Sequence, residues 1–403
     1  MSVDAALKLS GRPAGRIRPQ LDGLRRVLRE MGNPQRDFSS ILVVGTNGKG
    51  STAAMLEGIL RAHDLDTGLY TSPHLVQIEE RIRLNGRPIE GSVLSRELAR
   101  LDDYPELTYF EALTAAAFAI FSEAGVDVAV LKAGMGGSWD ATRLAESAIA
   151  GITNVGTDHS RWLGREPATI ARDKGRALAA AGRSVIGPGL DATLVAELDA
   201  PHAVAAETIV RSENHSPGFL RLKWGRLVLD VRPSLSGRFQ VDNLRLAVAL
   251  AIEAEKAGFV ELDADRMRSA LEGVDWPGRL SRHVIAGREI LIDCAHNLEA
   301  AEALAQHLRT LVKRYNLVFS CLDDKPVDEM AEVLKPQVRD VAVYRLDDDR
   351  AMSVERLLSA FPEAVVAADA FSALDLLRDP VIAAGSIRVA GDLLADVNSV
   401  VRS

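Results

Sequence analysis

The chain has 403 residues, of which 47% are hydrophobic, so it is long enough to bury a large core spread over two or three domains. Its formal net charge of -8 excludes a general positive field for holding DNA or RNA. The two cysteines, Cys294 and Cys321, lie in apolar runs, as buried thiols of a reducing cytoplasm do. The N-terminal segment lacks the apolar core of a signal peptide and no stretch reaches the roughly 18 apolar residues that span a bilayer, so we expect a soluble cytoplasmic protein.

The first half of the sequence alternates apolar runs of strand type with helical patterns. Residues 39–45 (SSILVVG) form a predicted strand that enters a glycine-rich turn and then a helix from about Ser51. A long apolar helix at 111–125 is followed by strand patterns at 126–134, 148–156 and 183–189. This alternation is typical of α/β units around a largely parallel sheet. The more polar residues 212–230 are expected to form antiparallel structure or an insertion.

A second α/β series begins near Val284. The predicted strands are residues 288–297, 316–322, 341–346, 364–370 and 386–392, with helical patterns such as 301–315 and 327–336 between them. This series predicts a smaller, doubly wound domain. Pro277 and Gly278 interrupt the helical pattern, so we divide the chain into domains at 1–280 and 281–403. Ligands of open α/β sheets lie beyond the carboxyl ends of the strands, which favours a substrate cleft between the two domains.

The most specific local pattern is VVGTNGKGST, residues 43–52. Its glycines allow a tight turn whose amides converge on phosphate oxygens, Lys49 adds a point charge, and the following helix adds its positive N-terminus. The spacing is shorter than in the usual G-x-x-x-x-G-K-[ST] loop. A glycine-rich turn after a strand is often only a turn. The lysine and hydroxyl residue placed between a buried strand and a helix nevertheless predict nucleotide binding.

Further motifs occur in the order in which one enzyme family carries them. They are GNPQRDF (32–38), GTNGKGS (45–51), LYTSPHLVQIEERIRLNGRPI (69–89), LTYFEALTAAAF (107–118), GMGGSWDAT (134–142), GITNVGTDHSRWLG (151–164), PATIARDKG (167–175), WPGRL (276–280), LIDCAHN (291–297) and DDKPVDEM (323–330). In these motifs the chain resembles the folylpolyglutamate/dihydrofolate synthases, a branch of the Mur ligase superfamily, from about residue 32 to residue 391.

The resemblance implies a P-loop ATPase domain with a mostly parallel sheet, followed by a smaller Rossmann-like α/β domain, in a monomeric enzyme. It also implies an amide ligase that phosphorylates a carboxylate with ATP and lets an amino group displace the phosphate. The implied substrates are dihydropteroate or a folate, and L-glutamate. Because charge builds on phosphoryl oxygens during the transfer, such a catalyst needs Mg²⁺, lysine and loop amides placed in advance.

The resemblance assigns roles to individual residues. Candidate nucleotide-binding residues are Gly45, Thr46, Asn47, Gly48, Lys49, Gly50, Ser51, Thr52, Gln240, Asn243, Arg279, Asp293, His296 and Asn297. Candidate metal ligands are Ser51, Ser72 and His159, and candidate catalytic residues are Lys49, Lys132, His159 and Lys174. Lys174 matches a lysine that is carbamylated in the family. The alternatives are a helix N-cap at Ser51, a structural histidine at 159 and a solvated lysine at 174.

In the second half, Gln240 and Asn243 resemble the family's H-Q-x-x-N element, and Arg279 resembles an arginine that contacts phosphate or the linker. The segment LIDCAHN resembles the family's D-G-A-H-N strand end, which is implied to reach the nucleotide and glutamate. Cys294 replaces the glycine of that motif, which a thiol can do only where the backbone keeps a negative φ.

One departure concerns the metal. Where the family has E-V-G-x-G-G-R-x-D-A-T-N with a Mg²⁺-binding glutamate, this chain reads LKAGMGGSWDATR, so that Lys132 takes the glutamate position. A protonated ammonium has no acceptor and repels a dication. Ser138, Trp139 and Arg143 also stand where arginine, a small aliphatic residue and asparagine are usual.

Three hypotheses remain open at this point. The first is a working ligase that keeps one Mg²⁺ while Lys132 neutralises phosphate charge. The second is a specialised ligase of a secondary pathway with another acid or amine, for which Trp139 would mark a changed pocket. The third is a paralogue that binds nucleotide without catalysis. The other phosphate-handling motifs are retained, which favours a working ligase.

Overall fold

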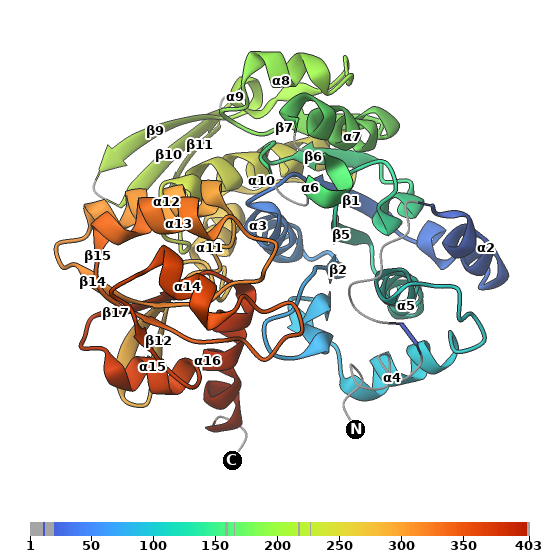
Figure 1. The fold of residues 1–403 in the computed structure, drawn as a ribbon. Helices are drawn as coiled ribbons and strands as arrows, with labels where there is room; N and C mark the ends of the chain where they lie inside the picture. The colour runs from blue at the N-terminus through green and yellow to red at the C-terminus, as the bar shows by residue number, and fades with distance from the viewer. Residues whose placement is uncertain are drawn as a thin grey trace. The chain divides into compact units, whose positions relative to one another are not determined.

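The computed structural model describes residues 11–12, 20–157, 160–164, 166–216, 218–225 and 227–400; the side chains of 160–161, 214–216 and 396–400 are not described. The chain divides into two compact units. Unit 1 contains Met1–Ser234 and Gln240–Val274, and unit 2 contains Leu235–Phe239 and Asp275–Ser403 (Figure 1). Among the described residues, no helix is long and apolar enough to cross a membrane.

Unit 1 is built on an eight-stranded sheet of order β4-β3-β2-β5-β1-β6-β7-β8. The six strands β2, β5, β1, β6, β7 and β8 pair in parallel, and β3 pairs antiparallel with both β2 and β4. The strands are β1 (Ser39–Val44), β2 (Thr67–Tyr70), β3 (Ile82–Leu84), β4 (Arg87–Pro88), β5 (Val128–Lys132), β6 (Ile149–Ile152), β7 (Arg183–Ile186) and β8 (Val204–Ala205). The predicted strands at 39–45, 126–134, 148–156 and 183–189 correspond to β1, β5, β6 and β7.

Helices connect these strands. They are α2 (Asp22–Glu30), α3 (Lys49–Ala62), α4 (Gly91–Ala99), α5 (Tyr109–Ala124), α6 (Ser160–Leu163), α7 (Pro167–Ala180), α8 (Ala192–Glu197), α9 (Ala206–Ile209), α10 (Phe239–Lys256) and α11 (Ala264–Glu272), with 3-10 turns η1 (Pro34–Arg36), η2 (Ile78–Arg81) and η3 (Ala141–Ala145). The apolar pattern at 111–125 is confirmed as α5. Residues 212–230 are confirmed as antiparallel, in a separate sheet of β9 (Arg211–Ser216), β10 (Phe219–Trp224) and β11 (Leu227–Val231).

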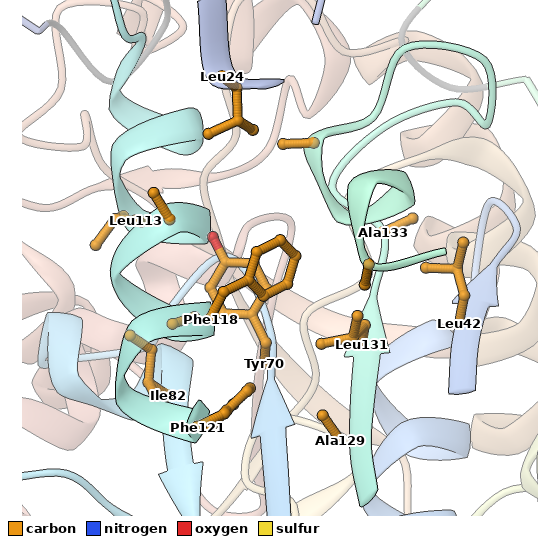
Figure 2. Packing of buried hydrophobic residues seen from close by; sticks show 14 of the residues in the cluster. Leu24, Leu42, Tyr70, Ile82, Leu113, Phe118, Phe121, Ala129, Leu131 and Ala133 are labelled. Atoms are coloured by element: carbon orange, nitrogen blue, oxygen red, sulfur yellow. The ribbon is translucent and has the colours of Figure 1, made fainter. Parts of the chain in front are cut away.

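A hydrophobic cluster lies between α5 and the strands beside it (Figure 2). Phe118 and Phe121 of α5 are fully buried, and Phe121 meets the ring of Phe38 edge to face at 5.8 Å. Leu131 of β5 belongs to the same cluster. Burying one such side chain contributes about 1.5–3 kcal/mol, so this cluster fixes the strands that carry the residues described below.

Unit 2 contains a six-stranded sheet of order β12-β13-β17-β14-β15-β16, parallel except for the β12–β13 hairpin. Its strands are β12 (Ser281–Ile285), β13 (Arg288–Ile292), β14 (Tyr315–Phe319), β15 (Val338–Val343), β16 (Val365–Val366) and β17 (Val381–Ala384). Its helices are α12 (Leu298–Thr310), α13 (Val327–Leu334), α14 (Val354–Ala360), α15 (Ala370–Leu376) and α16 (Ile387–Val400), with η4 (Lys335–Gln337). The prediction of two α/β domains, a larger one first and a smaller doubly wound one second, is confirmed.

One predicted strand of unit 2 is wrong. Residues 387–392 form the first turns of helix α16 (Ile387–Val400), and the strand is the preceding run β17, which is buried along its whole length. In α16 the buried hydrophobic residues recur at 389, 390, 393 and 394, which is helical spacing. Both segments are short and apolar, and periodicity over seven residues does not separate a strand from the first turns of a buried helix.

Candidate active site

The phosphate loop lies at the carboxyl edge of the parallel sheet, between β1 and α3. Gly45 has φ 137° and Gly48 has φ 82°, values that side chains disfavour, and Gly48 is the N-cap of α3. Helix α3 begins at Lys49, two residues earlier than expected. The amides at its start precede the first intrahelical bond, from the Thr52 N–H to the Gly48 carbonyl at 3.0 Å. They form an N-terminus suited to an anion.

Residues that follow β6 hold the loop in place. The side-chain oxygen of Asn154 accepts from the backbone N–H groups of Thr46 at 3.2 Å and Asn47 at 2.9 Å. The Thr153 hydroxyl donates to the Asn47 carbonyl at 2.6 Å, and a Cβ at Gly45 would stand 1.9 Å from that hydroxyl oxygen. The amides of Thr46 and Asn47 are therefore committed to the shape of the loop, and the helix start carries the anion-binding capacity.

Two lysine ammonium groups meet on one loop carbonyl. The Nζ atom of Lys49 donates to the carbonyls of Gly45 at 2.8 Å and Thr46 at 2.6 Å. Lys174, on α7 and only 3% exposed, donates to the same Gly45 carbonyl at 3.0 Å. Two like charges in a poorly solvated place repel each other. An anion bound at the loop would offset that repulsion, so this arrangement favours a phosphate ligand.

Two buried polar atoms beside the loop lack a hydrogen-bond partner. The Ser51 hydroxyl is 1% exposed and the Gln240 side-chain amide is also 1% exposed, and neither Ser51 Oγ nor Gln240 Nε2 has a partner. Leaving such groups unpaired costs about 1–3 kcal/mol each, so a bound ligand that engages them would be stabilised. Gln240 is held by Asn243, whose Nδ2 donates to its Oε1 at 2.9 Å.

The next strand end places Lys132 beside Ser72. Lys132 ends β5 and pairs with Val43 of β1, and Ser72 follows β2, the other neighbour of β5. The Lys132 ammonium donates to the Ser72 carbonyl at 2.5 Å and lies 3.3 Å from the Ser72 hydroxyl oxygen. The candidate metal ligand Ser72 therefore has a cation as its neighbour.

The loop after β5 is organised by Asp140. Its carboxylate accepts from the backbone N–H of Met135 at 2.8 Å and from the backbone and hydroxyl of Thr142. Burial raises the pKa of this carboxyl, while these hydrogen bonds and the charge of Lys132 act in the opposite direction. Nearby, the Arg143 guanidinium donates to the Ser138 carbonyl at 2.5 Å, and burial lowers the pKa of Arg143. Trp139 is half-buried.

The candidate residues of unit 2 cluster at the end of β13. The Asp293 carboxylate accepts from the backbone N–H groups of Leu280 at 3.0 Å and Ala295 at 2.9 Å. Burial raises the pKa of Asp293 and the charge of Arg279 opposes that rise. Asn297 caps α12 by accepting from the Ala300 N–H at 2.9 Å, so it has a structural role whatever else it does.

His296 and Cys294 complete this strand end. His296 Nδ1 lies 2.8 Å from the Cys294 carbonyl oxygen. Cys294 is not among the described non-glycine residues with a positive φ, so it takes the place of glycine without backbone strain. Burial raises the pKa of the Cys294 thiol to about 12, which makes it an inert packing group and not a nucleophile.

The candidate residues of unit 1 therefore gather at one sheet edge, apart from His159, which lies outside the described residues. Thr153, Asn154, Asp140 and Asp173 also organise this edge and were not among the predicted site residues; Asp173 accepts from the Gly137 N–H at 2.8 Å. The available signal was position, because Thr153 and Asn154 directly follow a buried parallel strand, where ligand-side loops begin.

The donors available to a divalent cation differ between the two candidate places. The unpaired buried hydroxyl of Ser51 fits a metal that accompanies phosphate. Ser72 does not fit, because the Lys132 ammonium already contacts it. Among the described residues, no group of three or more His, Cys, Asp or Glu side chains is arranged to hold a metal ion.

Comparison with known proteins identifies the family. The family described as Mur ligase, glutamate ligase domain, matches residues 278–389. The dihydrofolate synthase/folylpolyglutamate synthase of Mycobacterium tuberculosis is 34% identical, over 93% of this chain and 84% of that protein. A probable bifunctional folylpolyglutamate synthase/dihydropteroate synthase of Haloferax volcanii is 33% identical over 93% of this chain, which spans 48% of that relative's length.

Solved structures agree with this. The Mycobacterium tuberculosis folylpolyglutamate synthase complexed with ADP and AMPPCP has a TM-score of 0.87 and 31% identity, covering 97% of this chain and 96% of that one. A bifunctional folylpolyglutamate synthase/dihydrofolate synthase with Mn, AMPPNP and L-glutamate bound has a TM-score of 0.86 and 25% identity, covering 98% of each chain. The fold and the phosphate loop define an ATP-dependent ligase of the Mur type. Within that class, the chain belongs to the dihydrofolate synthase/folylpolyglutamate synthase family.

Proposed function

We propose that this chain is an ATP-dependent ligase that joins L-glutamate to dihydropteroate or a folate through an amide bond. The observation that carries the proposal is the loop before α3, where the ammonium groups of Lys49 and Lys174 meet on the Gly45 carbonyl. The unpaired Ser51 hydroxyl beside them is a further group that a polyphosphate or its metal would satisfy. Family membership supports the choice of acid and amine.

The reaction consists of two displacements. A carboxylate oxygen of the acid attacks the terminal phosphorus of ATP, the bond from that phosphorus to the bridging oxygen breaks, and ADP leaves. The amino nitrogen of glutamate then attacks the carbonyl carbon of the acyl phosphate, inorganic phosphate departs with the bonding electrons, and the nitrogen loses a proton to solvent. Lys49 and the amides at the start of α3 stabilise charge on the phosphoryl oxygens.

The proposed reaction also requires a divalent cation. Bound at Ser51 with the nucleotide, it would neutralise charge on the terminal phosphates. His159 is the other candidate ligand and lies outside the described residues. Roles for Gln240 and Asn243 beside the nucleotide, and for Arg279, Asp293, His296 and Asn297 toward nucleotide or glutamate, are part of the same proposal.

The proposal also covers a modification of Lys174, the oligomeric state and the cellular compartment. For Lys174 we also propose carbamylation, which would relieve the repulsion from Lys49 in a different way, by converting the buried cation into an anion. Incubation with ¹³C-labelled bicarbonate followed by ¹³C NMR would detect the new carbonyl. Its absence would show that Lys174 stays an ammonium, whose repulsion from Lys49 a bound phosphate offsets. The enzyme works as a monomer, which light scattering measures. It works in the cytoplasm, which its two buried, unpaired cysteines favour.

The experiment is an incubation of the purified protein with ATP, Mg²⁺, L-glutamate and either dihydropteroate or a reduced folate. We expect phosphate release that requires both the acid and glutamate, together with a product heavier by one glutamyl residue. If ATP binds but no phosphate is released with any of the acids tested, the chain is instead a nucleotide-binding paralogue.

A second candidate is a ligase with the same phosphoryl chemistry and a different acid. It is favoured by the loop after β5, where Arg143 donates to the Ser138 carbonyl and Trp139 is half-buried, since these three positions depart from the family pattern. Phosphate release with an unrelated carboxylate, and none with dihydropteroate or folate, would decide for this candidate.

A further inference from the structure

Lys132 is a buried cation at the edge of the sheet that carries the phosphate loop. It is the last residue of β5 and is 8% exposed. Its Cα partner on β1 is Val43, two residues before Gly45. Parallel strands end at the same edge, so the Lys132 side chain and the loop start from neighbouring positions. A buried ammonium is costly unless it is paired.

The ammonium is anchored on the segment that follows β2. Its Nζ donates to the Ser72 carbonyl at 2.5 Å and lies 3.3 Å from the Ser72 hydroxyl. The buried carboxylate of Asp140 adds an opposite charge within electrostatic reach. The cation is therefore held by an oxygen-rich surrounding of carbonyl, hydroxyl and carboxylate, which are also the oxygen types that hard divalent ions bind.

Although these oxygens would suit a divalent ion, the ammonium of Lys132 excludes one. An ammonium offers no lone pair to a metal, its charge repels a dication, and it already contacts both oxygens of Ser72 that face it. We propose that Lys132 is a resident cation of the phosphate site, which takes the place of a divalent ion that Ser72 would otherwise help to bind. The chain then binds only the metal that accompanies the nucleotide. This inference rests on the proposed function, because it assumes that ATP binds at the loop.

Counting bound Mn²⁺ tests the inference. The protein is titrated with Mn²⁺ at a saturating concentration of a non-hydrolysable ATP analogue, and free Mn²⁺ is followed by electron paramagnetic resonance. We expect about one nucleotide-dependent Mn²⁺ per chain in the wild type and about two in Lys132→Glu, where a carboxylate ligand replaces the ammonium. Lys132→Met removes the charge without adding a ligand and should keep about one.

Lys313→Glu makes the same charge reversal at an exposed residue of unit 2 and should leave the count unchanged. A count of about two in the wild type would overturn the inference, and this holds even if Lys132→Glu does not fold. An unchanged count in a folded Lys132→Glu, judged by circular dichroism, would also overturn it. Failure of the wild type to bind the nucleotide analogue would instead refute the proposed function, so the two failures are distinguishable.

Discussion

A Cβ atom at Gly48 would stand 2.1 Å from the Oδ1 atom of Asn243. The loop residue and the α10 residue are therefore packed so closely that only a hydrogen fits between the Gly48 backbone and the carboxamide. Asn243 in turn donates to the Oε1 of Gln240, and the buried Nε2 of Gln240 has no hydrogen-bond partner. Helix α10 thus sets the position of the phosphate loop and presents an unpaired donor beside it.

Gly48→Ala should abolish nucleotide binding, because the new methyl group would displace Asn243 and would also require a residue with a side chain to adopt φ 82°. Isothermal titration with an ATP analogue measures the affinity. Gly32→Ala is the matched control, since Gly32 also has a positive φ, 86°, but has nothing within 4 Å of the added atom. We expect Gly32→Ala to lose some stability and to keep its nucleotide affinity. Equal affinities in both variants would show that the contact with Asn243 does not matter.

Lys49→Met should weaken binding of the ATP analogue by about 10–100-fold, because hydrogen bonds to charged groups contribute about 1.5–3 kcal/mol. The loss should be larger for an analogue with three phosphates than for ADP, since lysine is expected at the terminal phosphates. The readout is the shift in melting temperature that each nucleotide causes, which falls when affinity falls. Lys313→Met, at an exposed lysine of unit 2, is the control. A shift as large in Lys49→Met as in the wild type would exclude a phosphate contact.

Much of the fold was accessible from sequence because β1, β5, β6 and β7 are short apolar runs, and the helices α3, α5 and α7 lie directly before or after them in the chain. Strand β1, Gly45 and α3 are recognisable together, since a buried run, a glycine with unusual φ and a helical pattern occur in succession. The prediction failed where a segment was too short for its period to be read, as at β17 and the start of α16.

The organisation of the site was less accessible. Asn154 holds the phosphate loop by accepting from the backbone amides of Thr46 and Asn47, which lie more than one hundred residues earlier in the chain. No local sequence pattern predicts such a hydrogen bond. Lys132 was noticed because a lysine replaces an expected acid, but its attachment to the Ser72 carbonyl depends on the pairing of β5 with β2. Such contacts between distant segments follow from strand order, which the sequence alone leaves open.

Thr108→Ala should lower stability without affecting the nucleotide site. Thr108 caps α5 by accepting from the Glu111 N–H at 3.3 Å, while Glu111 accepts from the Thr108 N–H at 2.8 Å, a reciprocal capping box. Losing such a cap costs about 1 kcal/mol. Urea unfolding measures the change, and titration with the ATP analogue should give an unchanged affinity. A large loss of affinity would mean that α5 is coupled to the phosphate loop.

The free energy of unfolding should depend on pH through the carboxyl group of Asp293. Burial raises the pKa of this carboxyl above its unfolded value, so between the two pKa values the folded state holds more protons than the unfolded state. The contribution of Asp293 to stability therefore falls as pH rises through that window, and the deficit persists above it. Asp293→Asn removes this slope, although its amide adds a constant penalty because it cannot accept from both Leu280 and Ala295 as the carboxylate does.

Urea unfolding of the wild type and Asp293→Asn at a series of acidic to neutral pH values measures the difference between the two free energies of unfolding. That difference should move in favour of the variant as pH rises through the window. In parallel, the carboxyl ¹³C resonance that is missing in the variant should titrate above the ordinary pKa of an aspartate. A resonance that titrates below that value, or a slope of opposite sign, would mean that the backbone donors and Arg279 outweigh burial at this strand end.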